Sequence, residues 1–301
     1  MLQRSLEKMG WPPITLVTPV LNCAAYIEQT IQSVISQHYP NLEYFIIDGG
    51  STDGTLEIIQ AYAKEITGWI SEPDSGMYDA LNKGFAKSSN EIMGWISGTD
   101  ILHPGGLFVV GSVFRAFPDV EWITGTPTVV DESGATTEVR PLPHWSRVRF
   151  LAGANKYIQQ ESTFWRRSLW EKAGGYVDAS RRIASDFELW VRFFRHARLY
   201  SVSALIGAYR AHANSIGLED MAACHRVHSQ VIDAELESLP WGGALKRIQR
   251  VSSRLEVTPK VGFLWQPFVK FLKRRLYATP GSDWPPVIEY DQGRGWVKKQ
   301  P

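Results

Sequence analysis

The amino-acid sequence predicts an α/β fold: a mostly parallel, twisted sheet with helices on both faces, followed by a helical C-terminal extension. Short apolar runs alternate with apolar stretches of helical period over the first 120 residues, and polar residues follow three of these runs. Beyond Asp131 the alternation gives way to a different pattern. We therefore divide the chain into an N-terminal lead of residues 1–13, an α/β domain of residues 14–217 and an extension of residues 218–301.

The first half of the domain carries the alternation of strands and helices. Strands are expected at Ile14–Thr18, Glu43–Asp48, Gly68–Ser71, Ile92–Ile96 and Val120–Ile123. Helices are expected between them, with apolar stripes that contain Ile27 and Ile31, Leu56 and Ile59, Leu81 and Phe85, and Leu107–Phe117. Asn22 is expected to cap the first helix. Strands that are joined through helices favour right-handed crossovers and hence a parallel sheet.

The second half of the domain and the extension show other patterns. The elements that we expect here are a β-hairpin over residues 126–140, a loop or short helix at 147–154, a strand at 158–166 and a short helix at 168–173. Asp186 stands where the N-cap of a further helix is expected, and capping is the ordinary role of an aspartate there. In the extension we expect helices at 221–236, 243–255 and 261–277, and a poorly ordered terminus at 283–301.

Composition places the chain among ordinary globular proteins, with 44% hydrophobic and 21% charged residues. Cys23 and Cys224 lie far apart, so the sequence indicates neither a disulfide framework nor a zinc site, and a reducing compartment is favoured. We find no stretch that resembles a signal peptide or a membrane span. We therefore expect a cytoplasmic protein without a nucleic-acid partner.

The net charge of +1 conceals a basic tail. Residues 241–301 contain 12 Lys and Arg against 4 Asp and Glu, a balance of +8. The predicted helix at 261–277 has an apolar arc around Trp265 and Phe268, with Lys270 and Lys273 opposite. Such a helix suits either peripheral attachment to the inner face of the plasma membrane or packing against the α/β domain. The sequence leaves both alternatives open.

Polar residues close three of the predicted strands: Asn22, Asp48 and Asp100. A lone Asp100 before Pro104 would ordinarily be a turn residue. Because ligands of open α/β sheets bind outside the carboxyl ends of the strands, three such residues predict a cleft. Backbone N–H groups and carboxylates there suit a nucleotide or phosphate ligand with a cation. No G-x-G-x-x-G follows the first strand, which argues against a dinucleotide site.

Residues 15–22, 46–55 and 71–100, in this order, resemble inverting glycosyltransferase family 2, which has the GT-A fold. The resemblance covers about residues 14–215. The resemblance implies a nucleotide-sugar donor, with a UDP-sugar favoured, bound by residues 14–125, and an acceptor held by residues 126–217. The donor-binding residues that it implies are Thr18, Pro19, Asn22, Asp48, Ser51, Asp74, Asn82, Lys83, Thr99 and Asp100.

The resemblance also implies a divalent cation, Mn²⁺ or Mg²⁺, held by Asp100 and His212. The family's motif carries an acid where this chain has Thr99, so one carboxylate is missing from the expected cation site. Mg²⁺ commonly needs only one or two carboxylates beside phosphates and water. Lys83 is another possible source of positive charge for the diphosphate. The other interpretation is that Lys83 is an ordinary solvated residue of its helix. A structural role is the usual one for a lone histidine such as His212.

Asp186 matches the family's catalytic base, directed at the acceptor hydroxyl. Gln160 and Glu161 match residues on the acceptor side of the family's site. The other interpretation is that they lie at an exposed strand end and have no role in binding. The acceptor implied is a saccharide or lipid-linked saccharide, as in cell-surface polysaccharide or glycolipid assembly. Two rival functions remain. One is a catalytically silent nucleotide-sugar binder or scaffold, and the other is a nucleotidyltransferase, which would need a Gly-rich phosphate loop after the first strand.

Overall fold

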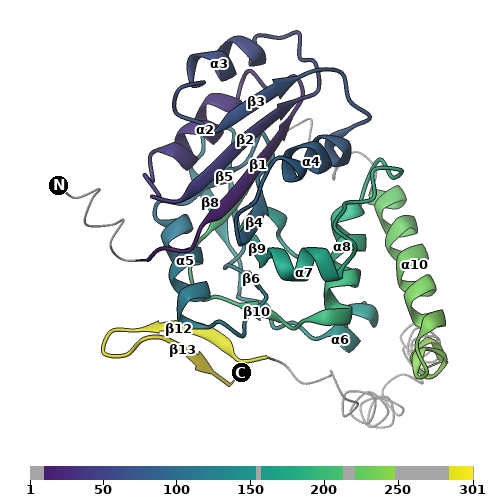
Figure 1. Cartoon of the computed structure of the whole chain (residues 1–301). Helices are drawn as coiled ribbons and strands as arrows, with labels where there is room; N and C mark the ends of the chain where they lie inside the picture. The colour runs from purple at the N-terminus through teal and green to yellow at the C-terminus, as the bar shows by residue number, and fades with distance from the viewer. Residues whose placement is uncertain (1–9, 154–156, 213–220, 248–284, 301) are drawn as a thin grey trace.

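The chain folds around a seven-stranded sheet in the computed structural model, which describes residues 10–153, 157–212, 221–247 and 285–300 (Figure 1). The strand order is β10-β6-β9-β4-β1-β2-β3. Every pairing is parallel except those of β9, which is antiparallel to β4 and β6. The predicted, mostly parallel sheet is thus confirmed. Its strands are β1 Ile14–Val20, β2 Leu42–Asp48, β3 Gly68–Ser71, β4 Ile92–Trp95, β6 Trp122–Thr124, β9 Thr163–Arg166 and β10 Leu199–Ser201.

Helices cover both faces of this sheet because successive strand residues point to opposite sides. Leu16 joins a core beneath three helices, and its neighbour Val17 joins the core on the other face. The first face carries α2 Ile27–Ile35, α3 Thr55–Ala61 and α5 Gly106–Ala116. The second carries α4 Met77–Ala86, α6 Arg147–Leu151, α7 Arg167–Lys172 and α8 Ser185–His196.

The second core is dense in indole rings. Trp95 stacks on Trp190 with ring centroids 5.6 Å apart and planes at 6°. Trp165 meets Trp95 edge-on at 5.4 Å, and Trp122 stacks on Trp190 at 5.7 Å. Aromatic pairs in these arrangements contribute about 0.5–1.5 kcal/mol beyond the area they bury. The cluster therefore fixes α8 rigidly on β4, β6 and β9.

A small second sheet has the order β5-β11-β7-β8, and it contains the predicted hairpin. Its strands are β5 Ile101–Leu102, β7 Thr128–Val130, β8 Thr136–Val139 and β11 Gly207–Arg210. The predicted strand at residues 158–166 is only partly correct, since Gln160–Ser162 form a 3₁₀ turn before β9. A Cβ on Gly207 would lie 2.1 Å from the carbonyl oxygen of Glu161, so only glycine lets β11 approach that turn.

Two predicted helix caps are wrong. The helix after β1 begins at Ile27 with Tyr26 at its N-cap, and Asn22 instead sits four residues earlier in a left-handed turn with φ of 51°. The N-cap of α8 is Ala184, also left-handed, so Asp186 lies inside the first turn. Neither the Asn22 nor the Asp186 side chain therefore caps its helix.

The extension begins with α10 Met221–Ser238, as predicted, and residues 242–247 are also helical. The predicted helix at 261–277, and residues 248–255 of the one before it, lie outside the described residues. None of the helices in the described ranges is long and apolar enough to cross a membrane.

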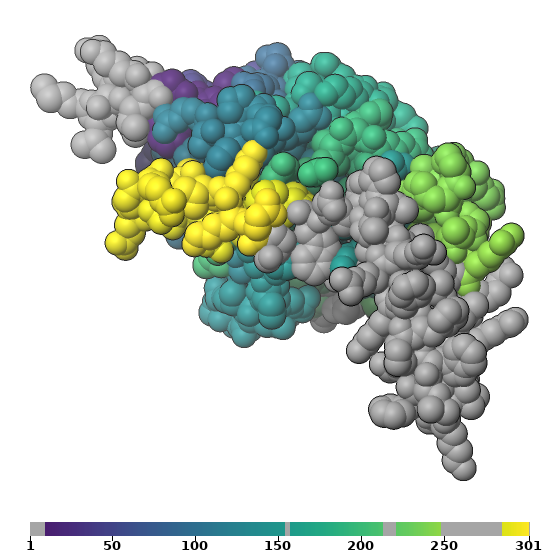
Figure 2. Space-filling view, turned by 90° about the horizontal axis from the view of Figure 1, so that it is seen from below, coloured from purple at the N-terminus to yellow at the C-terminus, as the bar shows by residue number. Residues whose placement is uncertain are grey.

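The prediction of a poorly ordered terminus at 283–301 is wrong. Residues 287–299 form a β-hairpin of β12 Val287–Asp291 and β13 Gly295–Lys299. It lies across the base of the molecule against α5 (Figure 2). The Ser203 N–H donates to the Ile288 carbonyl at 2.8 Å, and Trp296 Nε1 donates to Ser112 Oγ at 2.7 Å. Its buried Val287 and Ile288 supply the apolar contact that orders it.

Candidate active site

Three loops meet at the carboxyl edge of the central sheet, as their polar residues predicted. The Asn22 N–H, after β1, donates to the hydroxyl of Ser51, after β2, at 2.7 Å. Asn22 Oδ1 accepts the Thr52 N–H at 2.9 Å. The loop after β4 is tied to the same edge by the Gly98 N–H, which donates to the Pro19 carbonyl at 3.2 Å. The strand ends therefore form one continuous rim.

Asp48 is completely buried at the end of β2. Ser71 Oγ donates to its Oδ2 at 2.6 Å, and Ser51 donates to the carboxylate through both its N–H and its hydroxyl. Asp74 lies against the next turn, because a Cβ on Gly49 would come within 2.9 Å of Asp74 Oδ2. The bare backbone of Gly49 is thus what lets Asp74 reach the Asp48 loop.

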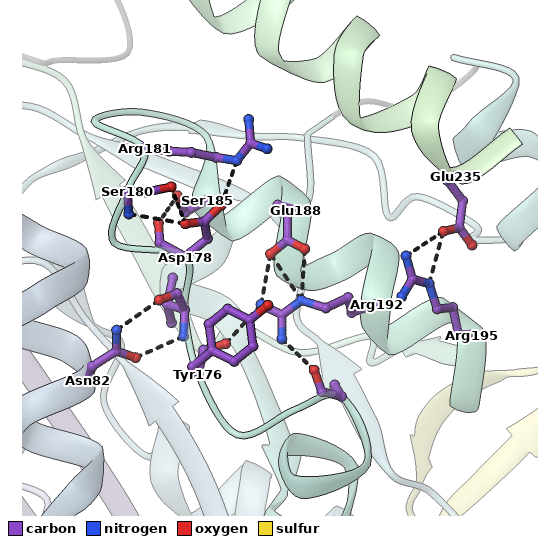
Figure 3. A network of polar contacts seen from close by, with 12 residues as sticks. Asn82, Tyr176, Asp178, Ser180, Arg181, Ser185, Glu188, Arg192, Arg195 and Glu235 are labelled. Atoms are coloured by element: carbon purple, nitrogen blue, oxygen red, sulfur yellow. Dashed lines mark hydrogen bonds and ion pairs between the residues drawn. The ribbon is translucent and has the colours of Figure 1, made fainter. Parts of the chain in front are cut away.

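Two residues implied as donor contacts have structural roles instead. Thr18 is fully buried, and its hydroxyl pairs with that of Tyr44 at 3.0 Å. It lies on the face of β1 that packs under α2, so its side chain points away from the cleft. Asn82 uses both groups of its amide on Val177, donating to the carbonyl and accepting the N–H at 2.8 Å each (Figure 3). Asn82 thereby anchors the loop before α8 to α4.

Lys83 is neutralised by its own surroundings. Its Nζ lies 2.8 Å from Glu72 and 3.4 Å from Asp79. The hydrogen bond that Lys83 donates to Glu72 raises the pKa of Lys83, which keeps it protonated. The charge of Lys83 is therefore shared between two carboxylates of its own surroundings.

Asp100 is buried at the end of the β4 loop, and burial together with the nearby Glu161 raises its pKa well above the ordinary value. Its Oδ1 accepts the backbone N–H of Arg210 at 2.8 Å. The Arg210 guanidinium is itself buried, with its Nε donating to the Thr99 carbonyl at 2.6 Å and Nη1 to the Glu132 carbonyl at 2.8 Å. Sequence reasoning missed Arg210, although it is what fixes Asp100 against β11.

His212 follows β11 and lies at the same end of the cleft as Asp100. Its ring packs on Tyr26 with centroids 5.3 Å apart, and the Arg210 guanidinium lies 5.2 Å above the same tyrosine ring. Burial lowers the pKa of His212. A histidine held neutral in this way is in the form that can bind a metal ion.

The acceptor-side residues are turned inward rather than exposed. The Gln160 amide donates to the Trp95 carbonyl, and Glu161 is buried with its Oε1 accepting from Gln159 at 2.6 Å. Burial, with a smaller contribution from the charge of Asp186, raises the pKa of Glu161 to about 7. Glu161 therefore lies within electrostatic range of both Asp100 and Asp186.

Asp186 lies half-buried in the first turn of α8. Burial raises its pKa, while the N–H groups of that turn and a hydrogen bond from the Tyr78 hydroxyl counteract the rise. Its loop is held by the Asp178 carbonyl, which accepts the Ser185 hydroxyl at 2.7 Å, and by Arg181, whose Nε lies 2.8 Å from Asp178 Oδ2 (Figure 3). Tyr78 is a second residue that sequence reasoning did not assign to the site.

The residues at this cleft fit a cation only if the ligand helps to hold it. Among the described residues there is no group of three or more His, Cys, Asp or Glu side chains that could hold a metal ion. Asp100 already accepts one hydrogen bond through Oδ1, and Thr99 contributes no carboxylate. Asp100, with His212 beside it, can therefore supply part of a coordination shell that donor phosphates and water would complete.

Comparison with known proteins identifies the same region. A family model described as "Glycosyl transferase family 2" matches residues 15–123. An uncharacterised glycosyltransferase of Mycobacterium tuberculosis is 32% identical over 187 residues, which is 60% of this chain and 68% of the relative. The poly-beta-1,6-N-acetyl-D-glucosamine synthase of Staphylococcus epidermidis is 26% identical over 169 residues, 54% of this chain and 41% of that protein.

Solved structures share the fold at low sequence identity. S. aureus TarS 1-349 in complex with UDP-GlcNAc superposes with a TM-score of 0.61 at 12% identity, covering 96% of this chain and 100% of that one. The mannosyltransferase PcManGT of Pyrobaculum calidifontis, in complex with GDP-Man and Mn²⁺, gives a TM-score of 0.54 at 15% identity over 93% and 87% of the two chains. Both superpositions establish the GT-A arrangement of the sheet and its helices.

Proposed function

Because this chain belongs to glycosyltransferase family 2, we propose that it is an inverting transferase that moves a sugar from a nucleotide-sugar donor to an acceptor hydroxyl. A UDP-sugar is favoured as donor, and a saccharide or lipid-linked saccharide as acceptor, as in polysaccharide or glycolipid assembly. The observation that carries the proposal is that Asp100 and Glu161 are both buried against β11, with Asp186 within electrostatic range of Glu161.

In this proposal Asp186 is the base. An alcohol is a weak nucleophile near neutral pH, and its positioned deprotonation accelerates transfer by about 10²–10⁴-fold. The acceptor oxygen attacks the anomeric carbon, its proton passes to Asp186, and the bond to the diphosphate breaks with its electron pair leaving on the diphosphate. Attack opposite the leaving group inverts the anomeric configuration. The raised pKa of Asp186 makes it a stronger base than an exposed aspartate.

The rest of the cleft holds the donor in this scheme. Asn22 and Ser51 form the hydrogen-bonded rim for the nucleoside, with the buried Asp48 holding Ser51 and with Asp74 alongside, and Asp100 and His212 face the diphosphate end. A divalent cation bound there would offset the negative charge that develops on the departing diphosphate. The complexes of TarS with UDP-GlcNAc and of PcManGT with GDP-Man and Mn²⁺ support a nucleotide-sugar donor and a cation.

Replacement of the base tests the proposal. Asp186→Asn keeps the size of the side chain and its distance from the donor rim, so donor binding should persist while transfer falls by at least about 100-fold. Donor binding is followed by calorimetry and transfer by product mass, with a panel of nucleotide sugars and Mn²⁺ or Mg²⁺. Wild-type protein that binds a donor but transfers and hydrolyses nothing would instead be the silent binder.

A further inference from the structure

The loop before Asp186 has a strained backbone. Ala184, two residues before Asp186, has a φ of 60°. Residues other than glycine rarely adopt this left-handed conformation, and they keep it only where surrounding contacts hold it. Strain of this kind is common at functional sites. The contacts that hold residues 177–185 therefore decide where the Asp186 carboxyl group lies.

Two hydrogen-bonded steps connect this loop to α4. The Asn82 amide donates to the Val177 carbonyl and accepts the Val177 N–H, at 2.8 Å each (Figure 3). The next residue, Asp178, accepts the Ser185 hydroxyl through its carbonyl at 2.7 Å. Val177 and Ser185 are completely buried, so water has little access to either step. Because Ser185 directly precedes Asp186, the path that begins at Asn82 ends at the base.

Tyr78 makes a more direct contact from the same side of α4. It lies four residues before Asn82, the spacing that brings two side chains to one face of a helix. The Tyr78 hydroxyl interacts with the carboxyl group of Asp186 and with the N–H groups of Ser185 and Asp186. The tyrosine is buried in the same core as Phe187. One face of α4 therefore reaches both the base and the loop that carries it.

We propose that Asn82 is a positioning residue for the base, Asp186, and that it acts through the loop of residues 177–185. The inference rests on the proposed function, and it gives Asn82 a role other than the donor contact that the family resemblance implies. A misplacement of about 1 Å can slow an enzymatic reaction about 100-fold, so a base on a strained loop needs such an attachment. The donor rim is held by separate hydrogen bonds, such as that between Asn22 and Ser51, so donor affinity should not depend on Asn82.

Substitutions along the path test this role. Asn82→Ala removes both hydrogen bonds to Val177 and should lower kcat about 10- to 100-fold, while the Kd of the donor changes less than about 2-fold. Ser185→Ala, a smaller change at the second step, should lower kcat with the same unchanged Kd. Transfer is followed by product mass and donor binding by calorimetry, and thermal unfolding shows whether each variant is folded. Weaker donor binding with unchanged kcat would make Asn82 a donor contact and overturn the proposal.

Asn90→Ala is the matched control. It removes an amide hydrogen bond of 2.9 Å to the carbonyl of Ile14, which starts β1 at the end of the sheet away from the cleft. This variant should leave kcat unchanged even if it unfolds at a lower temperature. An equal loss of kcat in Asn90→Ala and Asn82→Ala would mean that general destabilisation explains the effect, and it would refute the positioning role.

A double substitution tests whether the path leads through the base. Asp186→Asn has no carboxylate to position, so the addition of Asn82→Ala should lower its residual transfer no further. If Asn82→Ala instead costs the same factor in both backgrounds, Asn82 acts independently of Asp186 and the proposal is wrong.

Hydrogen exchange separates the inference from the proposed activity. Amides of residues 177–188 should exchange several-fold faster in Asn82→Ala than in the wild type or in Asn90→Ala, because a lost attachment makes local opening easier. Unchanged exchange in this segment overturns the attachment, whether or not the protein transfers a sugar. A wild type that transfers nothing from any donor refutes the proposed function, and the positioning role with it, even where exchange confirms the attachment.

Discussion

Arg210→Lys should be strongly destabilising although it keeps the charge. The guanidinium donates from Nε to the Thr99 carbonyl at 2.6 Å, and from Nη1 to the Asp131 and Glu132 carbonyls at 3.0 and 2.8 Å. Its Nη2 also donates to Gln29 on α2. A lysine ammonium is a single point and cannot reach acceptors on three separate segments. With two charged hydrogen bonds lost at about 1.5–3 kcal/mol each, we expect the free energy of unfolding to fall by about 3–6 kcal/mol.

Urea unfolding followed by circular dichroism measures this loss. A domain has about 5–15 kcal/mol of stability in total, so the transition midpoint should move far to lower urea. Arg140→Gln is the matched control, because its ion pair with Glu138 is more than half exposed on both sides and should change stability by less than about 1 kcal/mol. A loss below about 1 kcal/mol for Arg210→Lys would show that this guanidinium does not hold the loop of Asp100.

Three further predictions concern a carboxyl group, the cation and the hairpin. Glu161 has a pKa of about 7 in the folded state against 4.5 in the unfolded state. The folded protein therefore loses stability as the pH rises from 4.5 through 7, because Glu161 must then lose its proton while buried. Glu161→Gln should therefore stabilise metal-free protein at pH 8 by up to about 3 kcal/mol, and not at pH 4.5, in thermal unfolding; a pH-independent difference contradicts the burial argument. Thr99→Asp should tighten Mn²⁺ binding about tenfold by calorimetry with UDP present, whereas uncharged Thr99→Asn should not; equal effects would mean that the added charge does not reach the cation. Trp296→Ala should lower the free energy of unfolding by about 2 kcal/mol and expose residues 287–299 to protease, and an unchanged digestion pattern would mean that this side chain does not hold the hairpin.

The sheet and its rim could be predicted from the sequence because they depend on local periodicity. Apolar runs gave the strands, and the polar residues that close them, such as Asn22 and Asp100, identified the cleft. The side of β1 on which Thr18 lies was not local information, since it depends on which face of the strand α2 covers. Arg210 was missed for a similar reason, because its acceptors lie 78 to 181 residues away in the chain.

The hairpin at 287–299 could not be predicted with the same local reasoning, because it depends on contacts with distant parts of the chain. Apolar and charged residues alternate from Ile288 to Asp291, and a turn that contains Gly293 separates β12 from β13, which begins at Gly295. That pattern is typical of a hairpin, yet an isolated two-stranded unit is marginal in water. What orders it is the surface of β10 and α5, where Val202 bridges to Ile288 and Lys298 lies 2.6 Å from Asp119.

The stacked indole rings also give the protein an intrinsic spectroscopic signal for changes near the cleft. Rings as close as Trp95, Trp165 and Trp190, with centroids 5.4 to 5.8 Å apart, exchange excitation and couple their transitions. The Trp95 carbonyl accepts a hydrogen bond from Gln160, and Trp95 ends β4, which the Asp100 loop follows. The indole cluster is therefore connected to Gln160 and to Asp100 at the candidate site. Near-ultraviolet dichroism should therefore register a small shift of β4 on ligand binding without any attached label.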